Sequence, residues 1–180
     1  MGEASETEAK FRVANPEVAR EAVSRIGATL VRERHFEDNV LFDDSAGSLR
    51  AAGGVLRLRI TPHASVLTFK GPRQIEEGIK TREERQTLVQ QPEALREILA
   101  RLGYQPVFRY QKYRESWTHR GQEIEIDELP IGTFMEIEGD PDGIRAVTAD
   151  LGHLPSEYLG DSYVELFFGQ GGEGDMTFDP

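Results

Sequence analysis

Charged side chains stand at every second position in several short stretches of this chain, with apolar residues between them. A period of two is typical of a β-strand, because successive side chains leave a strand on opposite faces. Each stretch therefore places its charges on one face of a predicted strand. The charged positions are Glu6, Glu8, Lys10 and Arg12; Arg57 and Arg59; Lys70; Lys112 and Arg114; Glu123, Glu125 and Asp127; and Glu136 and Glu138.

These charges also sort by sign along the chain. The first and last of the strands carry acids, and the middle strands carry bases. Hard divalent cations prefer carboxylate oxygens, whereas arginine forks and lysine ammonium groups suit phosphate oxygens. One sheet face that collects both signs is therefore interpreted as a site for a metal ion together with a polyanion.

The composition excludes several other kinds of site. The chain has 180 residues, which fits one domain with its own core, and a formal net charge of −11, which argues against a nucleic-acid-binding role. A phosphate ligand remains compatible, since bases can be concentrated locally. Cysteine is absent, so disulfides, thiolate metal sites and cysteine nucleophiles are excluded. The histidines fall at no metal-ligand spacing and are expected on the surface or in loops: His35, His63, His119 and His153.

The predicted elements alternate between hairpins and short helices. No stretch is long and apolar enough to span a bilayer, so we expect no membrane association and a cytoplasmic protein. About eight strands, mostly joined as hairpins, and three or four helices predict an α+β fold with an antiparallel sheet. Strands are expected at 6–13, 29–42, 55–60, 65–70, 80–88, 107–118, 122–127 and 133–138, a connector at 48–52, and helices at 17–26, 92–102, 141–152 and 161–168.

The charged face of such a sheet has two possible environments. An ordinary antiparallel sheet packs its apolar face on a core and gives its polar face to water. Here, however, the polar positions are filled by charges with few neutral residues, and like charges such as Arg57 and Arg59 are neighbours on one face. The alternative is an inside-out closed barrel, in which the charged face lines a tunnel and helices cover the apolar face. In that space each charge needs a partner.

Seven motifs, in order from about residue 6 to residue 168, resemble the CYTH superfamily, the triphosphate tunnel metalloenzymes. The opening Glu6-Thr7-Glu8-Ala9-Lys10 is similar to the family's ExExK motif, and one departure is Gln86, which stands where many members continue with an acid. The other matching segments are Phe42-Asp43 with Gly54–Arg59, Thr68–Pro72, Arg82–Glu84, Lys112–Arg114, Ile126–Pro130 with Gly132–Glu138, and Ser162–Leu166.

The resemblance implies an eight-stranded antiparallel closed β-barrel with a charged interior and helices packed outside. It implies a single domain over residues 1–168, followed by a flexible, acidic, glycine-rich tail over residues 169–180. The implied cofactor is Mg²⁺ or Mn²⁺, and the implied partner is a small-molecule triphosphate, with a homodimer as one oligomeric state. The implied metal ligands are Glu6, Glu8, Asp127, Glu136 and Glu138, with Glu84 as an additional candidate. The implied substrate-binding residues are Lys10, Arg57, Arg59, Lys70, Arg82, Lys112 and Arg114, of which Lys10, Lys70 and Arg114 are the implied catalytic residues.

Three functions remain open at this point. The first is metal-dependent hydrolysis of an inorganic, nucleoside or thiamine triphosphate, in which water attacks the terminal phosphorus. The second is a class IV adenylyl cyclase, in which the ribose 3′-hydroxyl attacks the α-phosphorus of ATP and releases pyrophosphate. The third is a module that binds polyphosphate without turnover, although such a module gains nothing from carboxylates beside its anion. Hydrolysis is favoured slightly because both Glu136 and Glu138 are present.

Overall fold

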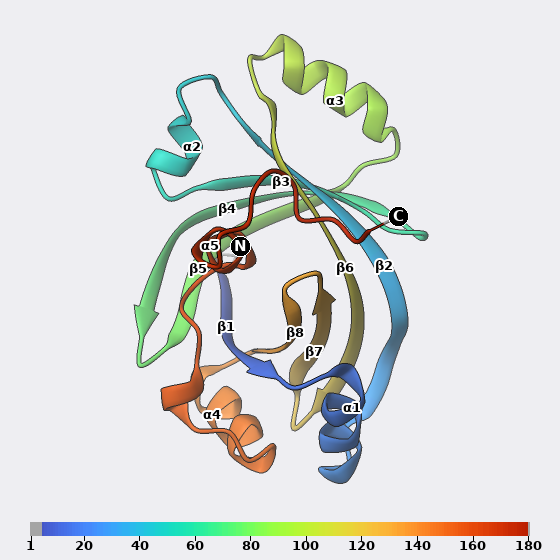
Figure 1. Ribbon diagram of the computed structural model, residues 1–180, viewed down its shortest axis with the longest axis vertical. Helices are drawn as coiled ribbons and strands as arrows, with labels where there is room; N and C mark the ends of the chain where they lie inside the picture. Colours follow the sequence, from blue (N-terminus) through green and yellow to red (C-terminus); the bar gives the residue numbers. More distant parts are fainter. Residues whose placement is uncertain (1–4, 180) are drawn as a thin grey trace.

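A computed structural model describes residues 5–179 of the chain, so residues 1–4 of the predicted domain and residue 180 of the predicted tail lie outside the described part. The described residues form eight strands, five α-helices and one 3₁₀ turn (Figure 1). The strands are β1 (Ser5–Val13), β2 (Thr29–Asp43), β3 (Val55–Ile60), β4 (Ser65–Glu76), β5 (Ile79–Leu88), β6 (Gln105–His119), β7 (Gln122–Leu129) and β8 (Gly132–Glu138). The helices are α1 (Pro16–Arg25), α2 (Ser48–Ala51), α3 (Pro92–Arg101), α4 (Pro141–Asp150) and α5 (Tyr163–Gly169), and the 3₁₀ turn is η1 (Pro155–Glu157).

The eight strands form one ring in which every neighbouring pair is antiparallel. The order around the ring is β1-β5-β4-β3-β2-β6-β7-β8, and β8 pairs back with β1. The predicted α+β class and eight-stranded antiparallel sheet are therefore confirmed. The pairing of β1 with β8 and with β5 joins segments far apart in the sequence, so hairpin patterns along the chain did not predict it.

The apolar face of the ring points outward and is covered by helices. Phe11, Ile124 and Ile137 are fully buried on β1, β7 and β8, where they pack in one cluster with Val23 of α1 and Ile144 of α4. In Figure 1, α1 and α4 lie together at one end of the molecule, and α2 and α3 lie at the other. This arrangement leaves the charged face of the strands directed into the ring.

A second apolar cluster covers the opposite side of the ring. Leu58 of β3 and Val40 of β2 pack with Leu99 of α3. The apolar spacing at 92–102 thus predicted the helix, but only part of its buried side, because Leu95 and Leu99 pack here whereas Ile98 and Leu102 are 54% and 68% exposed. No helix of the described residues is long and apolar enough to cross a membrane.

The connector expected at 48–52 contains a one-turn helix, α2. The carboxylate of Asp43, at the end of β2, accepts hydrogen bonds from the backbone N–H groups of Leu49 and Arg50 at 2.9 and 3.0 Å. These bonds satisfy backbone donors that a helix start leaves without partners. The helix was not predicted from the sequence. Its N-cap residue, Gly47, makes no side-chain hydrogen bond, and the carboxylate that accepts from its N–H groups belongs to Asp43, several residues earlier.

The C-terminal segment also differs from the expectation, because the predicted flexible tail packs against β6. Met176 is 1% exposed, its backbone N–H donates to Arg109 O at 2.9 Å, and its carbonyl accepts from Gln111 N at 2.9 Å. The physical reason is an unpaired strand edge: β6 pairs with β7 only from Tyr113 onward. The glycine-rich composition gave no sign of this partner.

The burial of the outer face leads to a stability prediction. We expect Phe11→Ala to lower the free energy of unfolding by about 3–5 kcal/mol, because it leaves a cavity under α1 and α4. The measurement is urea unfolding followed by far-ultraviolet circular dichroism. Val31→Ala on β2, where the side chain is 63% exposed, is the control and should change stability by less than about 0.5 kcal/mol. Equal effects of the two substitutions would contradict the outward apolar core.

Candidate functional site

The interior of the ring has an acidic arc and a basic arc. The pairing of β8 with β1 brings acids from the two ends of the sequence together, with Glu8 opposite Glu138. On the other side of β8, Glu138 is opposite Glu123, and Glu136 is opposite Glu125. The bases predicted to bind phosphate come mainly from β3, β4 and β6. Closure of the ring therefore places the strands that carry mainly acids on one part of its wall and the strands that carry mainly bases on another.

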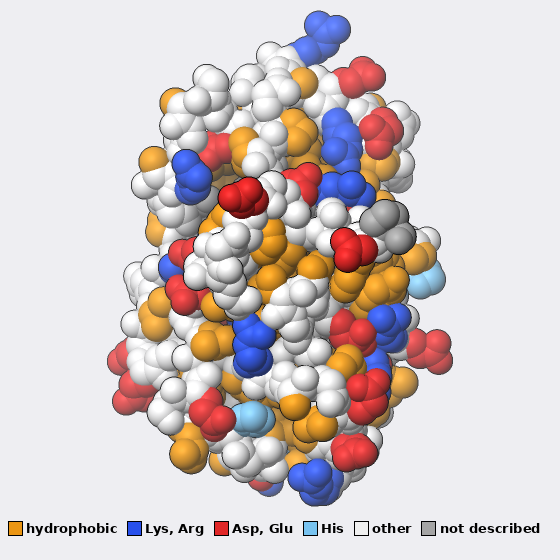
Figure 2. All heavy atoms as spheres, viewed as in Figure 1, with side chains coloured by type: hydrophobic (Ala, Val, Ile, Leu, Met, Phe, Trp, Pro, Cys, Tyr) orange, Lys and Arg blue, Asp and Glu red, His pale blue; other side chains and the backbone are white. Residues whose placement is uncertain are grey.

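Contacts between strands that are not neighbours show that these side chains point inward. Lys70 of β4 contacts Glu6 of β1 at 2.5 Å, although β5 lies between their strands. Arg114 of β6 reaches Glu136 of β8 at 2.5 Å across β7. On the face seen in Figure 2, by contrast, positive and negative side chains are interspersed. That face shows no comparable grouping of side chains of one sign.

Arg114 is the centre of the paired charges. Its guanidinium contacts Asp127 and Glu136 at 2.5 Å each, and Glu125 at 2.8 Å. Burial alone would lower the pKa of Arg114, but the coulombic attraction of Asp127 and Glu125 outweighs it and raises this pKa well above its ordinary value. Lys10 adds a contact to Glu136 at 3.2 Å. Arg114 is therefore held charged by the acids around it, whereas burial raises the pKa of Glu125 to about 8.

Asp127 lies among donors. Its fully buried carboxylate accepts from Lys112 Nζ at 2.9 Å, from Arg114, and from the hydroxyl of Tyr163 at 2.8 Å. The implied role of Asp127 as a metal ligand would require it to exchange these partners. In this arrangement it instead fixes the two bases of the Lys112–Arg114 pair, which are predicted to bind phosphate.

The remaining predicted acids lie near one opening of the ring. Glu6, Glu84 and Glu138 line a recess of about 380 Å³. Lys70 Nζ contacts Glu84 at 2.7 Å as well as Glu6, and Lys80 pairs with Glu8. Burial and the neighbouring carboxylates of Glu6, Glu123 and Glu8 raise the pKa of Glu138 to about 7. This part of the acidic arc therefore has more carboxylate charge than its bases neutralise.

The chemistry of this donor set fits a hard divalent cation. Carboxylate oxygens are the ligands that Mg²⁺ and Mn²⁺ prefer, and a cation would relieve the carboxylate crowding that raises the pKa of Glu138. In the described residues, no three acidic or histidine side chains are gathered around a common point. Because Lys70 and Lys80 hold Glu6 and Glu8, the acids would have to reorient to bind a cation together.

The basic arc contains the two neighbouring arginines of β3. Arg57 donates to the hydroxyl of Tyr110 at 3.3 Å, and Arg59 lies 3.5 Å from Glu37. Burial and the nearby Arg57 lower the pKa of Arg59, although Glu37 opposes this change. The predicted repulsion between the two bases is therefore present, and Glu37 partly offsets it.

Arg82, predicted to bind substrate, is used differently from the other bases. Its guanidinium donates to the backbone carbonyl of Gly71 at 3.0 and 2.6 Å, and to that of Gly53 at 3.4 Å. These bonds cross the irregularity between Lys70 and Arg73 where β4 shifts its register against β5. Arg82 thus holds the shape of β4, and the structure does not bring it to the Lys112–Arg114 group.

Two buried residues of the interior were missed by sequence reasoning. Glu37 is 1% exposed, and although burial opposes its ionisation, Lys112, His35 and Arg114 hold its pKa below its usual range. His35, expected on the surface or in a loop, is buried beside it with 3.4 Å between Nε2 and Glu37 Oε1. The alternation that places both inward was available in the sequence, but the adjacent acid Asp38 obscured it.

Tyr163 of α5 closes one side of the charged interior. Its ring lies 4.0 Å from Lys10 Nζ, a cation–π contact, and its hydroxyl bonds Asp127. Ser162 is the N-cap of helix α5: its hydroxyl accepts from Glu165 N, and the Glu165 carboxylate accepts from Ser162 N. Sequence reasoning predicted this helix but assigned Tyr163 no place in the site, because nothing in the local pattern shows where the helix docks.

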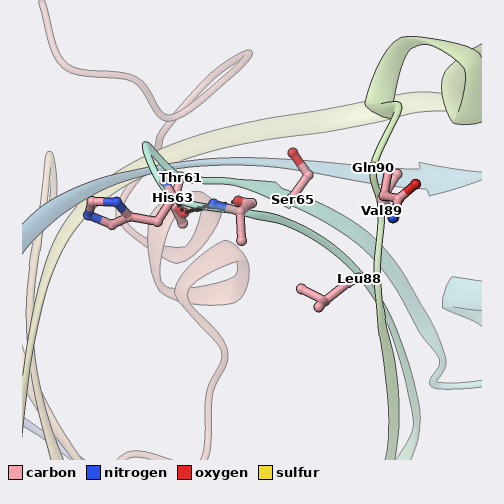
Figure 3. Close-up of a pocket in the computed structure, with 7 residues that line it drawn as sticks. Thr61, His63, Ser65, Leu88, Val89 and Gln90 are labelled. Atoms are coloured by element: carbon pink, nitrogen blue, oxygen red, sulfur yellow. Dashed lines mark hydrogen bonds between the residues drawn. The ribbon is translucent and has the colours of Figure 1, made fainter.

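A different recess is visible in Figure 3, at the turn between β3 and β4 and the end of β5. Its lining includes Thr61, His63, Ser65, Leu88 and Gln90. Among the described residues that line it there is no lysine, arginine, aspartate or glutamate. It therefore lacks the donors of the charged interior and is not the candidate site.

Known proteins share this fold and its sequence pattern. The CYTH domain model matches residues 4–153. A Methanocaldococcus jannaschii protein named "Putative adenylate cyclase MJ0240" is 28% identical over 134 residues, which cover 74% of this chain and 75% of that protein. A Vibrio parahaemolyticus structure has a TM-score of 0.81 at 20% identity, covering 93% of this chain and 99% of that one. HpAC1 from Hippeastrum has a TM-score of 0.71 at 20% identity, covering 93% and 97%.

These similarities, together with the ring and its charged interior, establish the class of protein. The chain belongs to the CYTH domain family. The predicted resemblance is therefore confirmed, and the two solved structures named above share the fold of this chain.

The attachment of α5 leads to a prediction about pH. Arg73 contacts the Glu165 carboxylate at 2.5 and 2.7 Å, and this hydrogen bonding lowers the pKa of Glu165 to about 2. A carboxylate with a lowered pKa contributes stability above its unfolded pKa, and this contribution is lost as the pH falls. We therefore expect the amide protons of α5 to exchange faster as the pH is lowered from about 5 to 2, after correction for intrinsic exchange.

The comparison variant is Glu165→Gln, in which α5 should already be less protected at pH 6 and should lose little more on acidification. Glu83→Gln, which removes the exposed pair with Arg85, is the matched control and should behave as the wild type. If Glu165→Gln keeps the acid-dependent loss of protection, Glu165 is not the responsible group.

Proposed function

We propose that this protein hydrolyses a triphosphate in the ring interior with the help of Mg²⁺ or Mn²⁺. The observation that carries the proposal is that the acids of β7, β8 and β1 and the bases of β3, β4 and β6 line one ring, where Lys70 reaches Glu6 and Arg114 reaches Glu136. A metal ion with a polyanion needs both signs within a few ångströms of each other. The HpAC1 protein, which shares the fold, is described as having a dominant triphosphatase activity.

The bases would bind and orient the phosphate chain. Arginine forks match phosphate oxygens in bidentate geometry, and buried lysines act as point charges. Positioning and charge stabilisation account for most of the catalysis in phosphoryl transfer, so no covalent nucleophile is required. Lys10, Lys70 and Arg114, each paired with a carboxylate in the structure, would transfer their contacts to the reacting phosphoryl group. The other phosphate-binding residues of the proposal are Arg57, Arg59 and Lys112.

The carboxylates Glu6, Glu8, Glu136 and Glu138 would hold the cation, with Glu84 as an additional ligand. The bound cation would polarise phosphate oxygens and orient the attacking water. The chain itself must release its internal pairs, because Lys70, Lys80 and Lys10 occupy three of these acids. Asp127 stays with Lys112 and Arg114 in this scheme and keeps them in place for the phosphate.

The second candidate is a class IV adenylyl cyclase, and the name of the Methanocaldococcus jannaschii relative favours it. The same cationic clamp serves both reactions. They differ in the attacking group, which is water at the terminal phosphorus or the ribose 3′-hydroxyl at the α-phosphorus. They also differ in where the cation sits along the phosphate chain.

Product identification separates the two reactions. Purified protein is given ATP, tripolyphosphate or thiamine triphosphate with Mg²⁺ or Mn²⁺, and the products are resolved by ³¹P NMR. Hydrolysis releases orthophosphate from the accepted substrate, whereas a cyclase forms cyclic AMP and pyrophosphate from ATP alone. Binding without either product would contradict both reactions and identify a binding module.

The acidic arc gives a direct test by substitution. We expect Glu8→Gln or Glu136→Gln to lower metal-dependent kcat/KM by about 100-fold or more, because each removes a carboxylate charge at nearly constant volume. Circular dichroism should show an intact fold. Glu97→Gln on the exposed side of α3 is the control. Unchanged rates in both ring variants would remove these residues from the site.

The basic arc gives a separate test that concerns binding. We expect Arg59→Ala to raise the Kd of tripolyphosphate about 10- to 100-fold, because charged hydrogen bonds to phosphate are lost. The affinity for Mn²⁺ alone, measured by isothermal titration calorimetry, should change by less than the affinity for the phosphate. Arg101→Ala at the exposed end of α3 is the matched control. A larger loss of Mn²⁺ than of tripolyphosphate affinity would place Arg59 outside the phosphate site.

A further inference from the structure

The wall made by β2, β3 and β4 contains buried polar atoms that have no hydrogen-bond partner in the protein. Both side-chain polar atoms of Asn39 are in this state, as are the hydroxyl of Thr68 and the Nε atoms of Arg57 and Arg59. Asn39 and Thr68 are each 0% exposed. Buried polar groups in folded proteins are nearly always hydrogen-bonded, so a group of unpartnered atoms in one wall requires an explanation.

The register shows that these four side chains belong to one patch. Asn39 on β2 is directly opposite Arg59 on β3, and Thr68 on β4 is directly opposite Arg57. Asn39 follows Glu37 by two residues on its strand, and Thr68 precedes Lys70 by two, so both share the inward face. Each of the two β3 arginines therefore has a neutral side chain beside it on the next strand.

The contrast with the rest of the interior is informative. Across the ring, Asp127 has three donors, and Glu136 is bound by Lys10 and Arg114. The patch on β2, β3 and β4 instead has several N–H and O–H donors, and its unpartnered acceptor atoms are those of Asn39 and Thr68 themselves and Glu37 Oε2, which lies 3.6 Å from Lys112 Nζ. An excess of donors is the arrangement that an oxyanion satisfies, because a phosphate oxygen accepts several hydrogen bonds and donates none.

Neutral donors have a physical advantage at this position. Arg57 and Arg59 already repel each other, and burial with that repulsion lowers the pKa of Arg59. A third cation would increase the repulsion, whereas an amide or a hydroxyl adds a hydrogen bond without adding charge. Asn39 drew no attention in the sequence because it is uncharged, and the charge alternation passes over it.

We infer that Asn39 and Thr68 are ligand-binding residues that donate hydrogen bonds to the phosphoryl oxygens held by Arg59 and Arg57. This inference rests on the proposed triphosphate site and adds two neutral contacts to it. Both residues then act on the phosphate chain and not on the organic group attached to it. Their contribution should be the same for an inorganic and a nucleoside triphosphate.

The experiment measures the Kd of tripolyphosphate and of ATP by isothermal titration calorimetry, each with EDTA in place of Mg²⁺ so that no turnover occurs. Asn39→Leu keeps the volume and removes the hydrogen-bonding atoms, and Thr68→Val does the same for the hydroxyl. We expect each variant to bind both ligands about 10-fold more weakly. Thr68→Ser, which keeps the hydroxyl, should stay within about 2-fold of the wild type. Thermal unfolding identifies any variant that does not fold, and the Thr68 pair then decides the result.

The matched control is Thr81→Val, which removes a hydroxyl that bonds Thr7 in another part of the ring wall. Unchanged affinities in folded Asn39→Leu and Thr68→Val would overturn the inference while leaving the proposed function intact. A loss confined to ATP would also overturn it and would assign the two residues to the organic group. Wild-type protein that binds neither ligand would overturn the proposed function and this inference with it.

Discussion

The structure depends on the neutralisation of charges that are sealed inside a ring of strands. A charged group removed from water is costly unless an opposite charge and hydrogen bonds compensate it. Arg114 meets this requirement with three carboxylates, and Lys112 with Asp127. These partners lie on the consecutive strands β6, β7 and β8, whereas closure of the ring supplies the partners of Lys10 and Lys70, because Glu136 and Glu6 lie on strands far from them in the sequence. The charged interior and the closed sheet are therefore two aspects of one arrangement.

The same pairing prepares the interior for exchange of partners. Lys70 is shared between Glu6 and Glu84, and Lys10 contacts both Glu136 and the ring of Tyr163. In the proposed function, a polyanion would take the bases and a cation would take the acids, so each internal pair would be replaced by a contact of like kind. Near Arg57 and Arg59, buried polar atoms have no hydrogen-bond partner within the protein, so there the internal pairing is incomplete.

The outside of the ring allows the inside to be polar. Most small domains bury their apolar face against a single core, whereas here the apolar residues of the strands lie outward under α1, α3 and α4. Helix α5 and the C-terminal segment complete the enclosure, with Tyr163 against Asp127 and Met176 against β6. The stability of the fold and the polarity of its interior are thus provided by opposite faces of the same strands.

The sequence by itself determined the strands, most of the helices and the face on which the charges lie. Period two and helical spacing are local properties, so Glu6, Arg57 and Glu136 could be placed on one face without knowledge of their neighbours. The family motifs extended this to the ring and to most of the candidate site. The order of the strands does not follow from such local properties, because the pairing of β1 with β8 joins residues more than 120 positions apart, for example Glu8 and Glu138.

Only the tertiary structure decided which charges neutralise each other. In the structure, Asp127 pairs with Lys112 and Arg114, and Arg82 donates to backbone carbonyls. The structure also places Glu37, Asn39 and Tyr163 in the interior. It also placed Met176 on a strand edge that β7 leaves unpaired. The physical reason is that alternation fixes the direction of a side chain relative to its own strand, whereas its partner depends on register and ring order. Those are set by contacts between distant segments, which no local pattern records.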